Sequence, residues 1–162
     1  MNTDEFLAAL NIVEKDHQLV LDKVQALRET VVDVFDPANV DAQRVVNRLR
    51  DINNYFATQF TAHMEEEEMT LFPFLEEYKP GGRELVARLR QEHAEILRKR
   101  EEFGNCVEFA AELEDGITRM VLRDLLAYGW ELWELLDRHA HTETQAVHEC
   151  LAECFAEQAT AK

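Results

Sequence analysis

The feature of this sequence that most constrains its fold is a histidine–glutamate pair, spaced four residues apart, that occurs twice. His63 precedes Glu67, and His139 precedes Glu143. Side chains four residues apart lie on one face of an α-helix, so the imidazole and carboxylate of each pair point the same way. Burying a carboxylate without a partner costs several kcal/mol, so such a pair on an inner helix face needs a cation. Each pair therefore predicts a helix that carries metal ligands.

The first pair continues a stripe of apolar residues. Taken alone, a histidine on such a stripe is more often a packed core residue, and four consecutive glutamates are more often a solvated face. The stripe steps by threes and fours, which places the pair on the buried side of a helix. Its apolar members are Val45, Leu49, Ile52, Phe56, Phe60 and Leu71.

An internal repeat favours the metal interpretation over core packing. A lone histidine stands 46 residues before each pair, His17 before His63 and His93 before His139. Adding 76 to positions 17, 63 and 67 gives 93, 139 and 143. Two helical hairpins thus carry the same ligand types at the same places, as an internal repeat does. The predicted metal ligands are His17, His63, Glu67, His93, His139 and Glu143.

Composition narrows the class of protein. The 162 residues fit a single domain over 1–162, and 31% charged with 46% hydrophobic residues is ordinary for a folded protein. With only five Gly, three Pro and no β-like alternation, the chain is predicted to be all-α. A net charge of −16 argues against nucleic acid and anionic membranes as partners. No apolar run is long enough to span a bilayer, and three sparse cysteines favour the cytoplasm.

The periodicity predicts four helices joined by short loops, as in an antiparallel up-down-up-down four-helix bundle. The first is predicted at about 4–35, and the second at about 40–78 with a stop or kink near Thr70, before Pro73. The third begins at about 83 and ends between 104 and 113. The fourth begins at about 115 or 117, with a break or bend beyond Glu143. At about 1.5 Å per residue, the six ligands fall in one layer near the second loop. The predicted inner stripe of the last helix is Val121, Leu125, Tyr128, Leu132, Leu135, His139, Glu143, Val147, Cys150 and Cys154.

Four imidazoles and two carboxylates in one buried layer suit two metal ions. Imidazole is a ligand for iron, zinc and copper, whereas magnesium and calcium prefer oxygen donors. A glutamate can bridge two ions with its two oxygens. The positions left over would admit a bridging oxide or hydroxide and an external small molecule, which distinguishes a reactive or sensing site from a closed structural one.

The ligand order on four helices resembles the hemerythrin-like, or HHE cation-binding, domain family. The segment HMEEEEMTLFP that begins at His63 is also similar to the acidic run and apolar-proline stop of that family. The resemblance covers nearly the whole chain. It implies a di-iron centre in which the four histidines are iron ligands and the two glutamates are bridges. The residues involved are His17, His63, Glu67, His93, His139 and Glu143.

Two departures from the family matter. Oxygen-carrying hemerythrins place another histidine one turn after the third-helix ligand, where this chain has Leu97. The second hairpin has Thr142 where the first has Glu66, and no proline follows Glu143. The loss at Leu97 leaves one iron short of a nitrogen ligand. It brings the chain nearer to relatives implicated in iron sensing, nitric oxide or peroxide response, and iron-centre repair.

Several functions are compatible with this ligand set. The leading hypothesis is a cytoplasmic non-haem di-iron protein that binds or senses dioxygen or a related diatomic such as nitric oxide. The alternatives are a di-iron enzyme that reduces peroxide or nitric oxide, an iron storage or delivery protein, and a structural helical interaction bundle. A ferritin-like site is disfavoured, because only Glu14 and His17 form the Glu-x-x-His motif it needs twice.

Other polar residues near the ligands have simpler interpretations. His141 and His148 are rotated away from His139 and are predicted to be exposed. Glu66 and Glu92 stand beside ligands and are either solvated acids or partners of the ligands. Core packing is the default for the aromatic residues Tyr55, Tyr128, Trp130 and Trp133.

Overall fold

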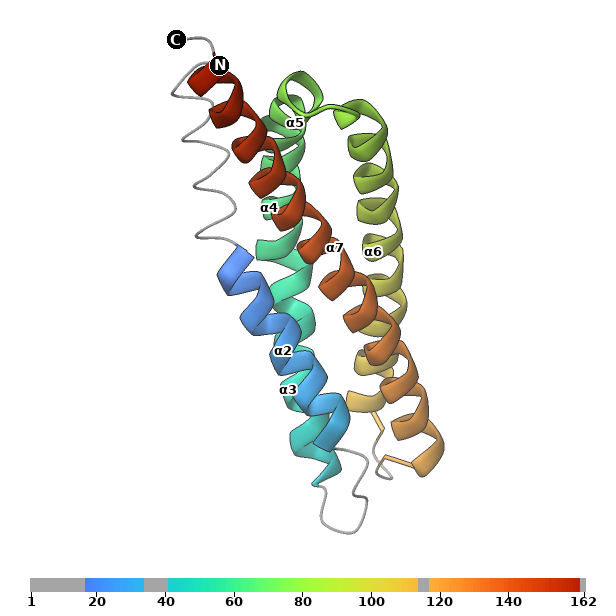
Figure 1. Cartoon of the computed structure of the whole chain (residues 1–162). Coiled ribbons are helices and arrows are strands. Elements are labelled where there is room, and N and C mark those ends of the chain that lie inside the picture. Colours follow the sequence, from blue (N-terminus) through green and yellow to red (C-terminus); the bar gives the residue numbers. More distant parts are fainter. Residues whose placement is uncertain (1–16, 34–40, 114–116, 161–162) are drawn as a thin grey trace.

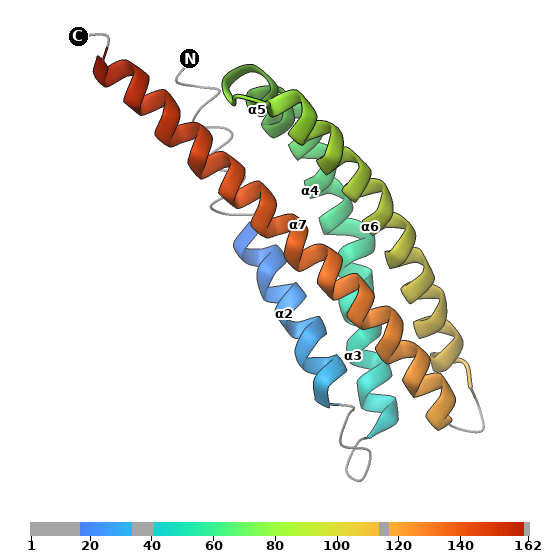
Figure 2. The ribbon, with the colours of Figure 1, turned by 45° about the vertical axis from the view of Figure 1, so that its right-hand side comes forward.

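The structure, a computed structural model, describes residues 17–33, 41–113 and 117–160 and is all-helical over them, with no strand. Four helical stretches lie side by side along a common long direction, as Figures 1 and 2 show from two sides. The first is α2 (His17–Asp33). The second contains α3 (Ala42–Tyr55), η2 (Phe56–Phe60), α4 (Thr61–Glu66), η3 (Glu67–Leu71) and α5 (Phe72–Tyr78). The third is α6 (Gly82–Ala111) and the fourth α7 (Arg119–Thr160).

The helix boundaries follow from local hydrogen bonding. Asp41 caps α3 by accepting a hydrogen bond from the Arg44 amide at 3.2 Å. Thr118 does the same for α7, since its hydroxyl oxygen accepts from the Val121 amide at 3.3 Å. The last helix therefore begins slightly later than the sequence predicted. The predicted helix before residue 17 and the first loop at residues 36–39 lie outside the described residues.

Pro73 does not end the second helical stretch. The expected stop or kink near Thr70 is replaced by the π-helical segment η3, after which α5 continues to Tyr78. Pro73 lies in the first turn of α5, where a missing amide hydrogen costs little. The π turn changes the hydrogen-bond register just before the proline, so the chain stays helical.

A polar layer separates two clusters of buried apolar side chains. On α6, His93 lies between Leu89 of the smaller cluster and Ile96 of the larger one. On α7, the site residues lie between Leu136 of the larger cluster and Ala146 of the smaller one. The smaller cluster fills the end next to the α5–α6 turn. It comprises Leu71, Phe72, Phe74, Leu75, Leu85, Val86, Leu89, Ala146, Val147 and Cys150.

Two expectations about the inner stripes are wrong. Val45 is only partly buried, and its neighbour Val46 has no exposed surface. Tyr128 is 37% exposed, because the adjacent Gly129 faces the neighbouring helix instead. A Cβ atom on Gly129 would lie 2.9 Å from a methyl carbon of Val31, so the missing side chain is what lets α7 approach α2 closely.

The last helix is long, as predicted. No break interrupts it beyond Glu143, and α7 runs for 42 residues to Thr160. The side chain of Cys154 lies outside the part of the structure that is described. Over the described residues, no helix combines the length and the apolar character needed to cross a bilayer.

Candidate metal centre

The structure brings together all six residues that the sequence singled out, at the level between the two apolar clusters. They come from all four helical stretches, and even the most exposed of them, His63, shows only 8% of its surface. Both glutamates are almost completely buried, at 0% for Glu67 and 1% for Glu143. The six are His17 on α2, His63 on α4, Glu67 on η3, His93 on α6, and His139 and Glu143 on α7.

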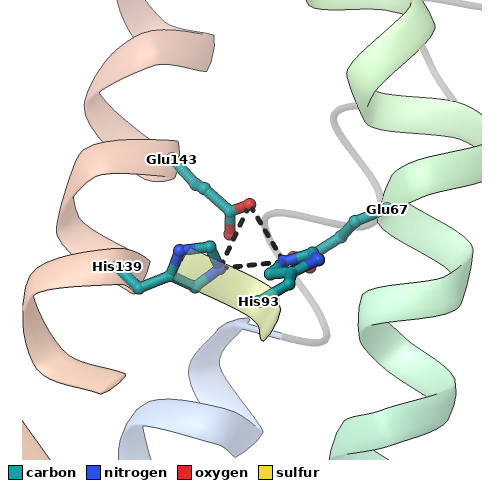
Figure 3. A group of neighbouring side chains, drawn as sticks. All are labelled: Glu67, His93, His139 and Glu143. Atoms are coloured by element: carbon teal, nitrogen blue, oxygen red, sulfur yellow. Dashed lines mark hydrogen bonds and ion pairs between the residues drawn. The ribbon is translucent and has the colours of Figure 1, made fainter. Parts of the chain in front are cut away.

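One half of the centre, here called the His93–His139 half, is shown in Figure 3. The Nε2 atoms of His93 and His139 are 3.0 Å apart. Glu67 Oε2 lies 3.4 Å from His93 Nε2, and Glu143 Oε1 lies 3.4 Å from His139 Nε2. One donor atom from each of these four residues lies within 4.8 Å of the other three. The four atoms therefore surround a space of the size that a metal ion occupies.

The other half, here called the His17–His63 half, uses the opposite oxygens of the same two carboxylates. Glu67 Oε1 lies 2.9 Å from His17 Nε2 and 2.8 Å from His63 Nε2. Glu143 Oε2 lies 3.4 Å from His17 Nε2. Each carboxylate thus directs one oxygen to each pair of histidines. This is the arrangement that a carboxylate bridging two ions requires.

The outer nitrogens of the histidines have unequal partners. His93 donates its Nδ1 hydrogen to Glu68 Oε1 at 2.9 Å, and His139 donates to Glu92 Oε2 at 2.9 Å, because an ionised carboxylate only accepts. His17 Nδ1 lies 3.1 Å from the Thr144 hydroxyl, which can donate or accept. His63 Nδ1 is buried without a hydrogen-bond partner.

The sequence identified these outer contacts incompletely. Glu92 is one of the two acids for which the sequence allows a contact with a ligand, and it makes that contact. Glu68 belongs to the glutamate run that the sequence predicts to be a solvated face, and no pattern marks Thr144. Neither contact has a local sequence signal, since Glu68 reaches a histidine 25 residues away and Thr144 one 127 residues away. Glu66, the other of the two acids, is exposed and lines a surface pocket beside His63.

The polar atoms of the His93–His139 half need a positive charge between them. With both Nδ1 atoms donating outward, neutral imidazoles would point two Nε2 lone pairs at each other across 3.0 Å. Glu67 Oε2 and Glu143 Oε1, which face the same space, are buried and accept no hydrogen bond. Buried acceptors left unpaired are costly. A proton shared between the two nitrogens would satisfy only those two atoms, whereas a metal cation would satisfy all four.

The directions in which the pKa values of these residues are shifted also indicate that the centre needs positive charge. Burial acts against the ionised form of Glu67, but its close contacts with His17, His63 and His93 hold its pKa well below the usual value. Burial and the neighbouring charge of Glu67 raise the pKa of Glu143. Burial alone would lower the pKa of His17, yet Glu143 and Glu67 together raise it to about 9. In the metal-free protein, a proton on His17 partly neutralises the carboxylates.

The remaining histidines lie outside the centre, as predicted. The His141 side chain is 71% exposed, and its Nδ1 is 2.7 Å from the backbone oxygen of Asp137. His148 is exposed as well. Leu97, at the position where oxygen-carrying hemerythrins have another ligand, is 37% exposed.

Comparison with known proteins identifies one family. The family model of the hemerythrin HHE cation binding domain matches residues 8–151, a span that contains all six residues of the centre. No curated protein and no solved structure matches the chain.

Proposed function

The chain belongs to the hemerythrin HHE cation-binding domain family, and from this premise we propose that it is a non-haem di-iron protein that binds or senses dioxygen or a related diatomic molecule. One observation carries the proposal. Two buried carboxylates each direct one oxygen to each of two histidine pairs. The proposed iron ligands are His17, His63, Glu67, His93, His139 and Glu143.

The donor set fits iron better than a hard oxygen-seeking cation. Four imidazole nitrogens suit iron, zinc or copper, and magnesium or calcium would require mostly oxygen donors. The unpaired buried oxygens of Glu67 and Glu143 both face the His93–His139 half and favour a cation there. The antiparallel up-down-up-down topology expected from the short loops belongs to the same proposal.

Each group of residues has a distinct part in this function. Glu67 and Glu143 would hold the two ions between them, and the histidines would offer Nε2 lone pairs as further ligands. Bound iron would supply a centre that changes oxidation state and keeps free positions for a small ligand. Phe72 stacks on His93 with ring centroids 5.2 Å apart, and Phe60 lies 5.9 Å from His63. These rings give part of the centre an apolar lining, which suits a small uncharged ligand.

A di-iron enzyme that reduces peroxide or nitric oxide is the second candidate. The observation that favours it is the pair of outer carboxylates. Glu68 is 44% exposed and Glu92 24% exposed, and each contacts the Nδ1 atom of a buried histidine. Such contacts link the centre to solvent and could deliver the protons that reduction of peroxide or nitric oxide consumes.

Iron content and ligand spectra test the proposal. Protein produced in iron-replete cells should contain about two iron ions per chain. His139→Ala should lower that content sharply, and the matched variant His141→Ala should leave it unchanged because His141 is exposed. A folded chain that takes up no iron under reducing conditions would contradict the proposal.

The two candidate functions are separated by mixing the reduced protein with dioxygen, nitric oxide or peroxide. A persistent and reversible absorbance change supports binding or sensing. Repeated consumption of peroxide or nitric oxide supports the enzyme.

A further inference from the structure

The two halves of the centre are equivalent in the sequence repeat but differ in their surroundings. We propose that they hold their metal ions with unequal strength, the His93–His139 half being the tight site and the His17–His63 half the exchangeable one. The inference rests on the proposed function, since it concerns the same two ions. The tight site is therefore expected to fill first, and the exchangeable site to lose its ion first. The identities of the six ligands alone do not predict this order.

The number of converging donors is the first reason. In the His93–His139 half, four donor atoms, one from each histidine and each carboxylate, lie within 4.8 Å of one another. In the other half, only the donors of His17, His63 and Glu67 meet that limit, and Glu143 contributes a longer contact to His17 alone. More preorganised donors mean that less reorganisation is needed when the ion binds.

The outer contacts are the second reason. The histidines of the tight half both donate to carboxylates, which fixes the tautomer with Nε2 as the metal-facing lone pair and makes that nitrogen more basic. In the exchangeable half, the Thr144 hydroxyl can pair with either tautomer of His17, and no described residue pairs with His63 Nδ1. Loss of such an outer partner typically weakens metal binding by about 10–100-fold.

Access from the surface is the third reason. A pocket of about 290 Å³ reaches His63 and is lined also by Tyr55, Gln59 and Glu66. A second pocket of about 390 Å³ reaches Thr144, the partner of His17. The second pocket is lined by none of the six residues of the centre, so only the first adjoins the His17–His63 half directly. An ion held there has a short path to solvent, whereas Phe72 stacks against His93 in the tight half.

Stepwise metal titration tests the inequality. Metal-free protein titrated with Co²⁺, and followed by visible absorbance and calorimetry, should bind one equivalent tightly and a second more weakly. Glu92→Ala and Glu68→Ala should each weaken the tight step by about 10–100-fold and leave the weak step unchanged. Glu92→Gln, which keeps an acceptor oxygen without charge, should fall in between. The control Glu65→Ala removes an exposed glutamate of the same run and should change neither step.

Release kinetics test the role of the pocket. When the Co²⁺-loaded protein meets excess chelator, one ion should leave several-fold faster than the other. Ala62→Leu narrows the pocket beside His63 and should slow the fast phase only. Ala94→Leu, an exposed change next to His93, is the matched control.

Each result has a distinct meaning. Two equal binding steps, or glutamate variants that weaken only the weaker step, would overturn the inequality while leaving a dinuclear centre intact. Failure of the wild-type protein to bind any metal would overturn the proposed function itself. Far-ultraviolet circular dichroism checks that each variant is folded, and the exposed position of Glu68 provides a second test if Glu92→Ala fails that check.

Discussion

At the scale of single residues, the two carboxylates differ from the histidines because each carboxylate contacts both halves of the centre. Glu67 Oε1 and Oε2 approach histidines of different halves, and Glu143 does the same. Each histidine offers only its Nε2 atom to the centre. A carboxylate substitution therefore affects both halves at once, and a histidine substitution removes one neutral ligand from one half.

We predict that Glu67→Ala and Glu143→Ala each retain at most one iron per chain. Removing a bridge takes away negative charge between two dications, whose repulsion at a few Å in a low-dielectric interior is large. His17→Ala should retain two irons and hold one of them more weakly. The measurement is iron stoichiometry of the three purified variants. Two irons held at wild-type affinity in both glutamate variants would rule out bridging.

At the scale of helices, the second stretch is the least regular and carries two of the six ligands. It alternates α-helical and π-helical segments, and η3 begins at Glu67 itself. π segments occur frequently at functional sites, where one extra residue per turn adjusts the direction of a side chain. The stretch ends at a tight turn, in which Gly81 has a φ angle of 72° and Gly82 begins α6.

The α5–α6 turn yields a ranked stability prediction. A Cβ atom on Gly82 would lie 1.9 Å from the backbone oxygen of Leu75, so Gly82→Ala forces the backbone to move and should cost about 3 kcal/mol or more. At Gly81 a side chain has open space but must adopt a left-handed conformation, which costs about 1–2 kcal/mol. The exposed change Arg83→Ala should stay within about 0.5 kcal/mol.

Urea unfolding of the three variants in the metal-free state measures these free energies. Metal-free protein is used so that changes in ion binding do not enter the comparison. If Gly81→Ala proved the more damaging of the two glycine variants, the close contact between Gly82 and α5 would be wrong.

At the scale of the whole molecule, a buried polar layer interrupts an otherwise apolar core. The layer links all four helical stretches, so its protonation and metal content bear on the stability of the entire fold. Without metal, the positive charge that it needs comes from protons, because contacts with the buried carboxylates raise the pKa values of His17 and His93 against the effect of burial. A bound cation takes the place of those protons.

We predict that the metal-free protein loses stability as the pH rises from 6.5 to about 9. Folding raises the pKa of His17, so this stabilisation is complete below 6.5 and is lost above about 9. The titration of one proton changes the free energy of unfolding by at most about 1.4 kcal/mol per pH unit. Urea unfolding at several pH values gives the slope.

Two comparisons control this prediction. His17→Gln should show a smaller slope over the same pH window, since it lacks the titrating group. The metal-loaded protein should also show a smaller slope, because the ion replaces the proton. Identical slopes in wild type and His17→Gln would contradict the assignment to His17.

The sequence by itself determined the helical class, the family and the identity of the six residues in the centre. These follow from local rules, because residues four apart share a helix face and a repeat of 76 residues copies the ligand positions. The second helical stretch also ends at Tyr78, where the predicted span of about 40–78 ends.

Only the tertiary structure decided how the two halves differ. The repeat makes His63 and His139 equivalent, yet Glu92 contacts His139 from another helix, whereas within the described ranges no residue forms a hydrogen bond with His63 Nδ1. Likewise, the direction of Tyr128 depends on how closely Gly129 lets α7 approach α2. Such contacts join residues far apart in the chain, and their geometry is set by helix packing. A periodic sequence pattern specifies which face of a helix is buried, and packing specifies what that face meets.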